Sequence, residues 1–425
     1  MRVGVGSLIV ILGLAPWVVR PDEPAEKKLP PPIHGKADPA FESIDQFMAL
    51  FLEKSNFPGA SLAMGRAGKM EYARAYGYAH REAKQPMRTD SLFRISSVSK
   101  ALTAVAIMQL VERGKLRLDD KVFEVLSLVP PGRGFDRRWR DITVEMLLEH
   151  RGGWDEKRSP DPMFISPQVA EEMGVAHPAM PPAIIAYMLR RKLDFEPGEK
   201  FAYSNFGYCL LGRIIEKVGR QNYEAHIKKQ VLAPLGIKTM RLGKTLFAQR
   251  APGEVKYYSS MQAVSVLGPL RGQKGPAAYG GFAMEALDSH AGWIACAPDL
   301  LRFVMAFDDP EKCKILRPES VERMLARPRG EDDKKDGWYA KGWSVQMFGK
   351  ERAYWHDGAL EGSAVIGARR SDGVCLAVML NCRDKKESDR EPIAVIMGPL
   401  LQVVNKVYVN RPRATGIMPG PTGGS

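Results

Sequence analysis

Apolar and aromatic residues gather in short runs near both ends of the chain, separated by turn signals. Near the start, 60–65 and 69–78 flank Ala67-Gly68, which is the pattern of a β-hairpin. Toward the C-terminus, three more segments have strand-like composition, at 342–348, 362–369 and 374–381. Ser371-Asp372-Gly373 adds a tight-turn signal between two of them. We therefore expect one sheet built from both ends of the chain.

The middle of the chain has the spacing of helices instead. Helical patterns occur at 143–150, 182–191 and 207–218. They predict an inserted, mainly helical subdomain over approximately 116–285, and a further helical pattern at 392–409 predicts a helix lying across the sheet. The expected fold class is α/β in the α+β sense: an antiparallel sheet flanked by helices, plus the inserted helical subdomain.

Both ends of the chain differ in composition from the body at 39–410. Residues 1–19 place Arg2 before an apolar run, which indicates a signal peptide or an N-terminal anchor. Residues 20–38 are rich in proline and charge and predict a solvated linker, and 411–425 predict a disordered tail. We therefore expect an exported protein, periplasmic or extracellular, with any membrane attachment made through the N-terminal segment only.

Charge, cysteine and histidine usage narrow the function classes. The formal net charge is +13, but the basic residues are scattered and form no nucleic-acid-binding motif. The five cysteines make no Cys-x-x-Cys pair, and the seven histidines make no His-x-x-x-His pair. We expect no nucleic-acid partner, no metal and no cofactor.

The first candidate for chemistry is Ser97-Val98-Ser99-Lys100, which stands before an amphipathic helical pattern that ends before Gly114. Residues three apart on a first helical turn share a face, so the Lys100 amine can reach the Ser97 hydroxyl. A serine needs a base, and a lysine with a depressed pKa can serve. The alternative interpretation is a serine that only caps a helix. Ser-x-x-Lys occurs once in this chain but is weak by itself.

A second candidate, Tyr203-Ser204-Asn205, precedes the helical pattern at 207–218. A tyrosine beside a lysine can be held as phenolate or share its proton, and so act as base and then as acid. Asn205 could orient substrate and Lys100. A competing Tyr-x-Asn at 408–410 adjoins the predicted tail, where a preorganised site is not expected.

The third candidate is His356-Asp357-Gly358-Ala359, which suits the edge of a strand lining a cleft. A cationic or hydrogen-bonding His356 could steer a carboxylate or hold a shared proton. Gly358 would let a ligand approach, and the Ala359 N–H could join that of Ser97 in an oxyanion hole. The alternative is a structural histidine. His150 ends a helical pattern and is assigned no chemistry.

Together these motifs resemble the serine beta-lactamase and penicillin-binding-protein superfamily, especially its class C-like esterase and D-aminopeptidase branch. The surroundings that strengthen the resemblance lie at 57–61, 76–79, 92–96, 147–153, 195–198 and 292–303. The resemblance implies a beta-lactamase/transpeptidase-like fold with Ser97 at the interface of sheet and helical subdomain. His356 departs from the pattern, because most beta-lactamases and transpeptidases have lysine there.

The leading hypothesis is a serine hydrolase that forms an acyl-enzyme at Ser97 on an ester or a small D-amino-acid-containing peptide. Lys100 and Tyr203 would transfer the protons, so these three residues must converge. One alternative is a beta-lactamase or DD-carboxypeptidase, and another is a noncatalytic cell-envelope binding protein of the same fold. The expected partners are a small-molecule ester or peptide and cell-wall fragments.

Overall fold

The computed structural model describes residues 31–331, 335–383 and 391–409, and its centre is an antiparallel sheet. The strands follow the order β1-β3-β2-β14-β13-β12-β11-β10, with β4 also paired to β3. Their bounds are β1 Ile33–His34, β2 Gly59–Arg66, β3 Lys69–His80, β4 Gln85–Pro86, β10 Gly337–Tyr339, β11 Ser344–Phe348, β12 Glu351–Leu360, β13 Ser363–Arg369 and β14 Val374–Leu380. Pairing of β2 with β14 joins the two ends of the chain in one sheet, so the predicted fold class is confirmed.

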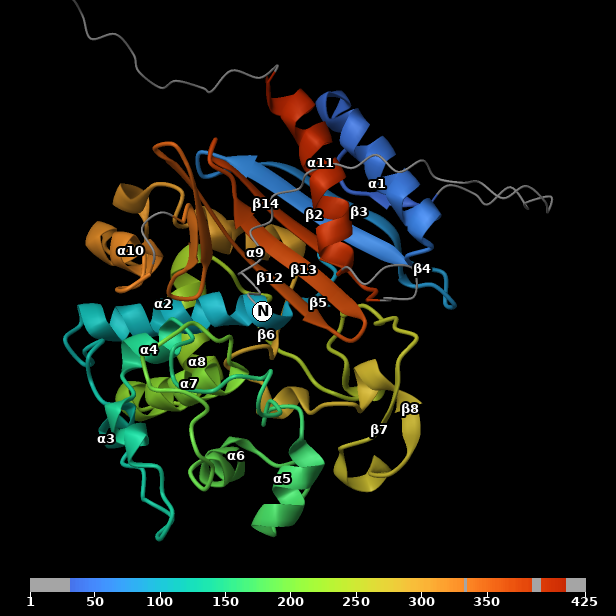
Figure 1. The fold of residues 1–425 in the computed structure, drawn as a ribbon. Coiled ribbons are helices and arrows are strands. Elements are labelled where there is room, and N and C mark those ends of the chain that lie inside the picture. Colours follow the sequence, from blue (N-terminus) through green and yellow to red (C-terminus); the bar gives the residue numbers. More distant parts are fainter. Residues whose placement is uncertain (1–30, 332–334, 384–390, 410–425) are drawn as a thin grey trace, which may run out of the picture.

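Helices cover both faces of this sheet (Figure 1). On one face lie α1, Glu42–Ser55, and α11, Pro392–Val409. The buried residues Ile44, Met48 and Leu52 recur every four positions along α1, which turns one apolar stripe toward the sheet. The opposite face packs against α9, Ala297–Met305, and α10, Pro318–Leu325, lies beside α2.

Helix α2, Ser99–Glu112, runs between the sheet and the helical part of the molecule (Figure 1). The sequence predicted an amphipathic helix here, and this was wrong. Every residue from Ser99 to Leu110 is buried, because neighbours cover the helix on all sides. Helix α2 is therefore buried on all sides over this stretch, and tertiary packing fixes the position of its N-terminus.

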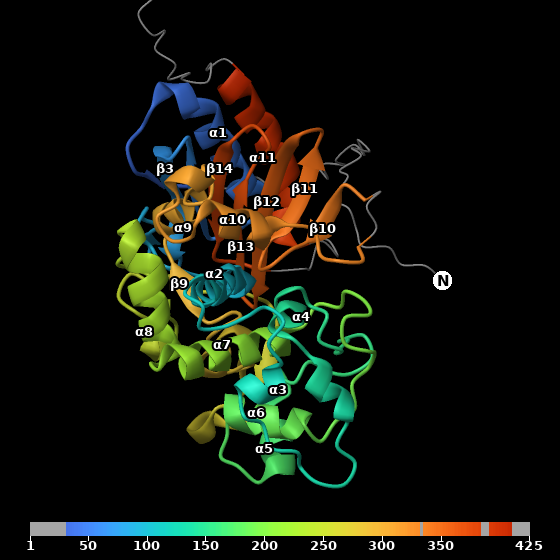
Figure 2. The ribbon, with the colours of Figure 1, turned by 90° about the vertical axis from the view of Figure 1, so that its left-hand side faces the viewer.

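The inserted region lies on the side of α2 away from the sheet (Figures 1 and 2). Its helices are α3 Val122–Val125, α4 Val144–Leu148, α5 Ser166–Met173, α6 Pro181–Met188, α7 Asn205–Gly219 and α8 Tyr223–Ile227. Short strands accompany them: β5 Phe93–Arg94, β6 Arg241–Leu242 and β9 Trp293–Ala295 form one small sheet, and β7 Gln262–Val264 pairs with β8 Lys274–Pro276. Helix α4 falls within the predicted 143–150, α6 overlaps the predicted 182–191, and α7 extends beyond the predicted 207–218 at both ends.

The end of the expected linker is part of the body. Ile33 and His34 form β1 and pair with Tyr76 and Ala75 of β3, and the Gly77 N–H donates to the Pro32 carbonyl at 2.8 Å. The proline run is thus followed by an edge strand, where pairing to a neighbour outweighs local composition. The leader at 1–19 and the tail at 411–425 lie outside the described residues.

Among the described residues, α11 is the one helix long and apolar enough to span a membrane. Its buried side chains, including Ile396, Leu400 and Val404, pack in a cluster shared with α1 and the sheet. That packing explains its apolar character as well as a membrane would. Cys209, Cys296, Cys313 and Cys375 are free thiols, and all of these except Cys313 are buried.

The buried side chain of Arg94 anchors strand β5, which leads to the Ser-x-x-Lys segment. Arg94 is fully buried in β5 and donates to the carbonyls of Ala278 at 2.6 Å, Lys244 at 2.9 Å and Thr245 at 3.2 Å. Its guanidinium lies 4.3 Å from the ring centroid of Tyr257. These contacts tie three distant segments to one side chain and satisfy carbonyls that burial would otherwise leave unpaired.

Replacing this arginine should weaken the fold. Arg94→Met leaves three carbonyls without a donor, so the free energy of unfolding should fall by about 3 kcal/mol. Urea unfolding followed by tryptophan fluorescence measures it. The matched control is Arg88→Met, because Arg88 is exposed and pairs only with Asp90 on the surface, so its effect should stay below about 0.5 kcal/mol. Equal effects of the two substitutions would contradict the anchoring role.

Candidate active site

Ser97 lies in a 3-10 turn over Ser96–Val98 that leads directly into α2. The N-cap of α2 is Val98, so Ser97 does not occupy the capping position of that helix. Ser96 has a φ of 50°, a conformation that non-glycine residues rarely adopt and that concentrates at functional sites. Ser97 itself is half-buried, whereas both its neighbours are buried. The turn therefore presents one hydroxyl to the outside.

Lys100 brings a buried amine to that hydroxyl. Its Nζ lies 3.1 Å from Ser97 Oγ, and it donates to Asn205 Oδ1 at 2.7 Å and to the His290 carbonyl at 3.1 Å. Burial disfavours the ammonium and lowers the pKa of Lys100 to about 7, against the opposing charge of Asp161. A substantial fraction of the amine is therefore neutral at physiological pH.

Tyr203 completes the predicted trio. Its phenol interacts with the Ser97 side chain, and Lys100 Nζ lies 4.7 Å from its ring centroid. Burial raises the pKa of Tyr203 well above its usual value, although the contact with Ser97 opposes that shift. A resident phenolate, one of the two expected states, is therefore disfavoured, because the enclosed oxygen lacks the solvation that a charge requires. The three groups converge, and the phenol holds its proton.

Asn205 is the first residue of α7 and faces the amine. Ser204 caps this helix, since its side chain accepts from the Gly207 N–H, which fixes where Asn205 lies. The Asn205 amide donates through Nδ2 to Asp161 Oδ2 at 2.7 Å while its oxygen accepts from Lys100. The structure therefore places Asn205 in contact with Lys100, and its role in orienting the substrate stays a prediction.

His356 lies beside the site, and both nitrogens of its ring are hydrogen-bonded within the protein. Its Nδ1 lies 2.6 Å from the Asp357 carbonyl, which can only accept, so Nδ1 carries the hydrogen and Nε2 accepts from the Tyr339 hydroxyl at 3.0 Å. Burial, helped by the charge of Lys100, lowers the pKa of His356 to about 3. Of the two expected forms of His356, cationic or hydrogen-bonding, the enclosed ring therefore favours the neutral, hydrogen-bonding one, and both its nitrogens are engaged within the protein.

Gly358 lets β12 approach the Ser97 turn. A Cβ atom at this position would lie 2.4 Å from the Ile95 carbonyl oxygen and 2.9 Å from Ser97 N, so only glycine fits. Ala359 follows, half-buried and paired with Ala364 of β13. The strand thus runs beside the backbone N–H of Ser97, and an oxyanion hole made with Ala359 stays a prediction.

His150, which was assigned no chemistry, braces the Tyr203 segment. Its Nδ1 accepts from the Ser204 N–H at 3.1 Å, its carbonyl accepts from the Ala202 N–H at 2.8 Å, and its ring centroid lies 4.2 Å from that of Tyr203. Burial lowers its pKa well below the usual value, so it is neutral. It holds the phenol in place by packing and by backbone contacts.

A cavity of about 530 Å³ opens beside Tyr203 and Ser204 within the inserted region. Its walls combine apolar residues, among them Trp154, Tyr187 and Leu193, with the carboxylates of Glu156 and Asp161. Glu156 has no side-chain hydrogen bond or ion pair with another described residue, and burial raises its pKa. The cavity can therefore receive a small molecule, and it adjoins the predicted trio at Tyr203, since neither Ser97 nor Lys100 lines it.

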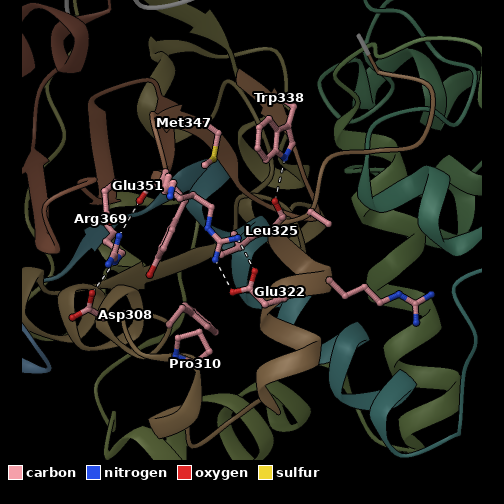
Figure 3. Close-up of a pocket in the computed structure, with 14 residues that line it drawn as sticks. Asp308, Pro310, Glu322, Leu325, Trp338, Met347, Glu351 and Arg369 are labelled. Atoms are coloured by element: carbon pink, nitrogen blue, oxygen red, sulfur yellow. Dashed lines mark hydrogen bonds and ion pairs between the residues drawn. The ribbon is translucent and has the colours of Figure 1, made fainter. Parts of the chain in front are cut away.

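A second hollow of about 730 Å³ lies between α10 and the β10–β12 edge of the sheet (Figure 3). Of the three arginines that line it, Arg352 pairs with Glu322 and Arg369 with Asp308. None of the predicted site residues lines it. This hollow lacks the chemistry of a reactive centre, so the candidate site is the one at Ser97.

The motif analysis of the sequence missed three groups at the site. Asp161 stands between two prolines in a loop, Tyr339 is in the short edge strand β10, and His290 contributes only its backbone carbonyl. Within the described residues, no group of three His, Cys, Asp or Glu side chains could hold a metal ion.

The sequence model of the Beta-lactamase family matches residues 44–397. That span contains the Ser97 turn, the Tyr203 segment and β12. The chain belongs to the beta-lactamase family, and the resemblance seen in its motifs is confirmed.

Individual relatives add detail. Penicillin-binding protein 4 of Amycolatopsis lactamdurans is 28% identical over 355 residues, which cover 79% of this chain and 84% of that protein. A probable fimbrial assembly protein, FimD of Dichelobacter nodosus serogroup H1, is 37% identical over 145 residues, and this match spans only 33% of its length. The solved D-amino acid amidase of Ochrobactrum anthropi SV3 with D-phenylalanine is 22% identical, has a TM-score of 0.66, and covers 88% of this chain and 99% of its own. The last likeness shows the shared fold.

Because β12 lies so close to the Ser97 turn, adding a methyl group at Gly358 should change the geometry of the site. Gly358→Ala should push β12 away from the Ser97 turn and slow the reaction of Ser97 with a fluorophosphonate by at least about tenfold, since a misplaced site loses its preorganised geometry. Intact-protein mass spectrometry over time measures the rate. Gly275→Ala is the control, because a Cβ there meets no atom within 4 Å. An unchanged rate in Gly358→Ala would show that this contact does not matter.

Proposed function

We propose that this serine hydrolase of the beta-lactamase family forms an acyl-enzyme at Ser97, with Lys100 as the base. The observation that carries the proposal is the 3.1 Å separation of Lys100 Nζ and Ser97 Oγ. The other two neighbours of the amine, Asn205 Oδ1 and the His290 carbonyl, can only accept hydrogen bonds. A neutral amine satisfies both with its two hydrogens, and its lone pair then faces the Ser97 hydroxyl.

Proton transfer follows from that geometry. When Ser97 Oγ attacks an acyl carbon, its proton passes to Lys100 Nζ and the carbonyl oxygen of the substrate becomes negative. Tyr203, protonated and in contact with Ser97, is placed to give a proton to the leaving group and to be reprotonated from Lys100. The N–H groups of Ser97 and Ala359 would receive the oxyanion. Water repeats the sequence on the acyl-enzyme.

The substrate we propose is an ester or a small amide, such as a D-amino-acid-containing peptide. The carboxylates of Glu156 and Asp161 line the cavity and act electrostatically on Lys100, so they suit a substrate that carries an ammonium group near the scissile bond. The D-amino acid amidase that shares this fold supports the same class. Partners beyond this small molecule, including cell-wall fragments, stay proposals.

A beta-lactamase or DD-carboxypeptidase activity is the second candidate, supported by the match to penicillin-binding protein 4. The neutral His356 counts against it, since substrates of that kind present a carboxylate to this strand and His356 offers no positive charge. We also propose that the protein acts outside the cytoplasm, because residues 1–19 have the composition of an export signal.

The first test is covalent labelling. Wild type should gain the mass of one fluorophosphonate adduct in intact-protein mass spectrometry, and Ser97→Ala should gain none, because the nucleophile is absent. Wild type should also hydrolyse p-nitrophenyl acetate or D-phenylalanine amide faster than nitrocefin. Labelling by penicillin together with rapid nitrocefin turnover would support the second candidate instead. An absence of labelling and turnover would favour a binding protein without catalysis.

The second test is pH dependence. Lys100 must be neutral to accept a proton, and its pKa of about 7 makes the amine neutral above that pH. The rate constant for fluorophosphonate labelling should therefore fall about tenfold for each pH unit below 7 and level off above it. Rates measured between pH 5 and 9, corrected for reagent hydrolysis without protein, check this. A profile that is flat or that falls with rising pH would rule out Lys100 as the base.

A further inference from the structure

Asp161 is a carboxylate that touches the site through another residue. Its Oδ2 accepts from Asn205 Nδ2 at 2.7 Å, and its Oδ1 accepts from the Met163 N–H at 3.0 Å. The Phe164 N–H donates back to the Asp161 carbonyl at 3.1 Å, which closes a turn in front of α5. The loop thus holds the carboxylate in one orientation, with one oxygen aimed at Asn205.

That contact decides which way the Asn205 amide faces. With Nδ2 toward Asp161, Oδ1 must point toward Lys100 Nζ, 2.7 Å away. A rotated amide would set its N–H groups against the amine hydrogens and its oxygen against the carboxylate. Both contacts would be repulsive. Asp161 therefore keeps an acceptor in front of the amine.

We propose that Asp161 is a positioning residue, which acts through Asn205 to aim the Lys100 lone pair at the Ser97 hydroxyl. The inference rests on the proposed function of Ser97 and Lys100. If Asn205 Oδ1 and the His290 carbonyl take the two amine hydrogens, the remaining direction is toward Ser97, 3.1 Å away. Loss of the Asn205 acceptor would free one hydrogen to turn toward Ser97 and would block the proton transfer.

Charge is the second contribution of Asp161: burial raises the pKa of its carboxyl, while the hydrogen bonds from Asn205 and from the Met163 N–H oppose that shift and favour the carboxylate. The ionisable groups that face or act on Lys100 come from several elements: Asp161 and Glu156 before α5, Asp357 and His356 in β12, Tyr203 and Tyr208 around α7, His150 after α4, and His290 before β9. The three acids favour the ammonium, and the histidines are neutral. Removing the Asp161 charge should therefore make Lys100 easier to deprotonate.

Two substitutions separate orientation from charge. Asp161→Asn keeps an oxygen that can accept from Asn205 but loses the charge. Its kcat on the high-pH plateau should therefore stay within about threefold of the wild-type value, while the acidic limb, the pH range in which kcat falls because Lys100 is protonated, moves down by about 0.5 to 1 pH unit. Asp161→Ala loses both, so kcat should fall at least about tenfold with KM changed less than about threefold. Full pH profiles of p-nitrophenyl acetate hydrolysis by the intact chain give both quantities.

A matched control carries the same chemical change on α5. Glu171 forms an exposed ion pair with Arg271, so Glu171→Gln should leave both the plateau and the acidic limb as in wild type. Thermal melts verify that each variant is folded. If Asp161→Ala does not fold, Asp161→Leu takes its place, because leucine has nearly the same shape as aspartate and also cannot accept from Asn205, so the same fall in kcat is expected.

The outcomes are distinguishable from failure of the proposed function. If wild type is not labelled at Ser97, the proposed function is wrong and the role of Asp161 falls with it. A different outcome is that wild type is labelled and active, while Asp161→Asn keeps the wild-type acidic limb and a folded Asp161→Ala keeps the wild-type kcat. In that case Asp161 has no positioning role, and the proposed function stands. A loss in Asp161→Ala that Asp161→Asn rescues supports the inference.

Discussion

The site depends on the buried amine of Lys100, which must be hydrogen-bonded by the protein and yet left free to accept a proton. An ammonium enclosed by protein is unfavourable unless acceptors surround it, and a fully paired ammonium would be a poor base. The carbonyl oxygens of Asn205 and His290 stabilise the amine, and burial keeps the pKa of Lys100 near 7. This balance requires α2, α7 and the segment before β9 to meet at one point, so the enclosed position of α2 is a condition of the chemistry.

The architecture creates that meeting point by building its sheet from both ends of the chain. The β2–β14 pairing closes the sheet, and β12 then lies close enough to the Ser97 turn that Gly358 tolerates no side chain. The inserted region supplies the opposite wall, with Tyr203 held by His150. Neither half contains a complete site, because the hydroxyl and amine belong to one segment and the phenol to another.

The two sides of the site differ in charge. On the β12 side, His356 is neutral and its ring nitrogens are engaged by the Asp357 carbonyl and Tyr339. On the side of the inserted region, Glu156 and Asp161 place carboxylates beside the cavity. This distribution of charge supports the proposal of a neutral or ammonium-bearing substrate, since an anionic one would require a positive charge on the β12 side.

The sequence by itself determined the elements and the reactive trio. Apolar periodicity located the strands at both ends and the helices α4, α6, α7 and α11, because burying one face of a strand or helix leaves a local, readable pattern. The fixed spacing of Ser97 and Lys100 placed them on one turn. Only the tertiary structure decided that α2 is buried on every side, that Ile33 and His34 join the sheet, that His356 is neutral and that Asp161 reaches Asn205. These properties depend on neighbours far away in the chain, whose packing sets solvation and partner choice, and no local pattern of residues records them.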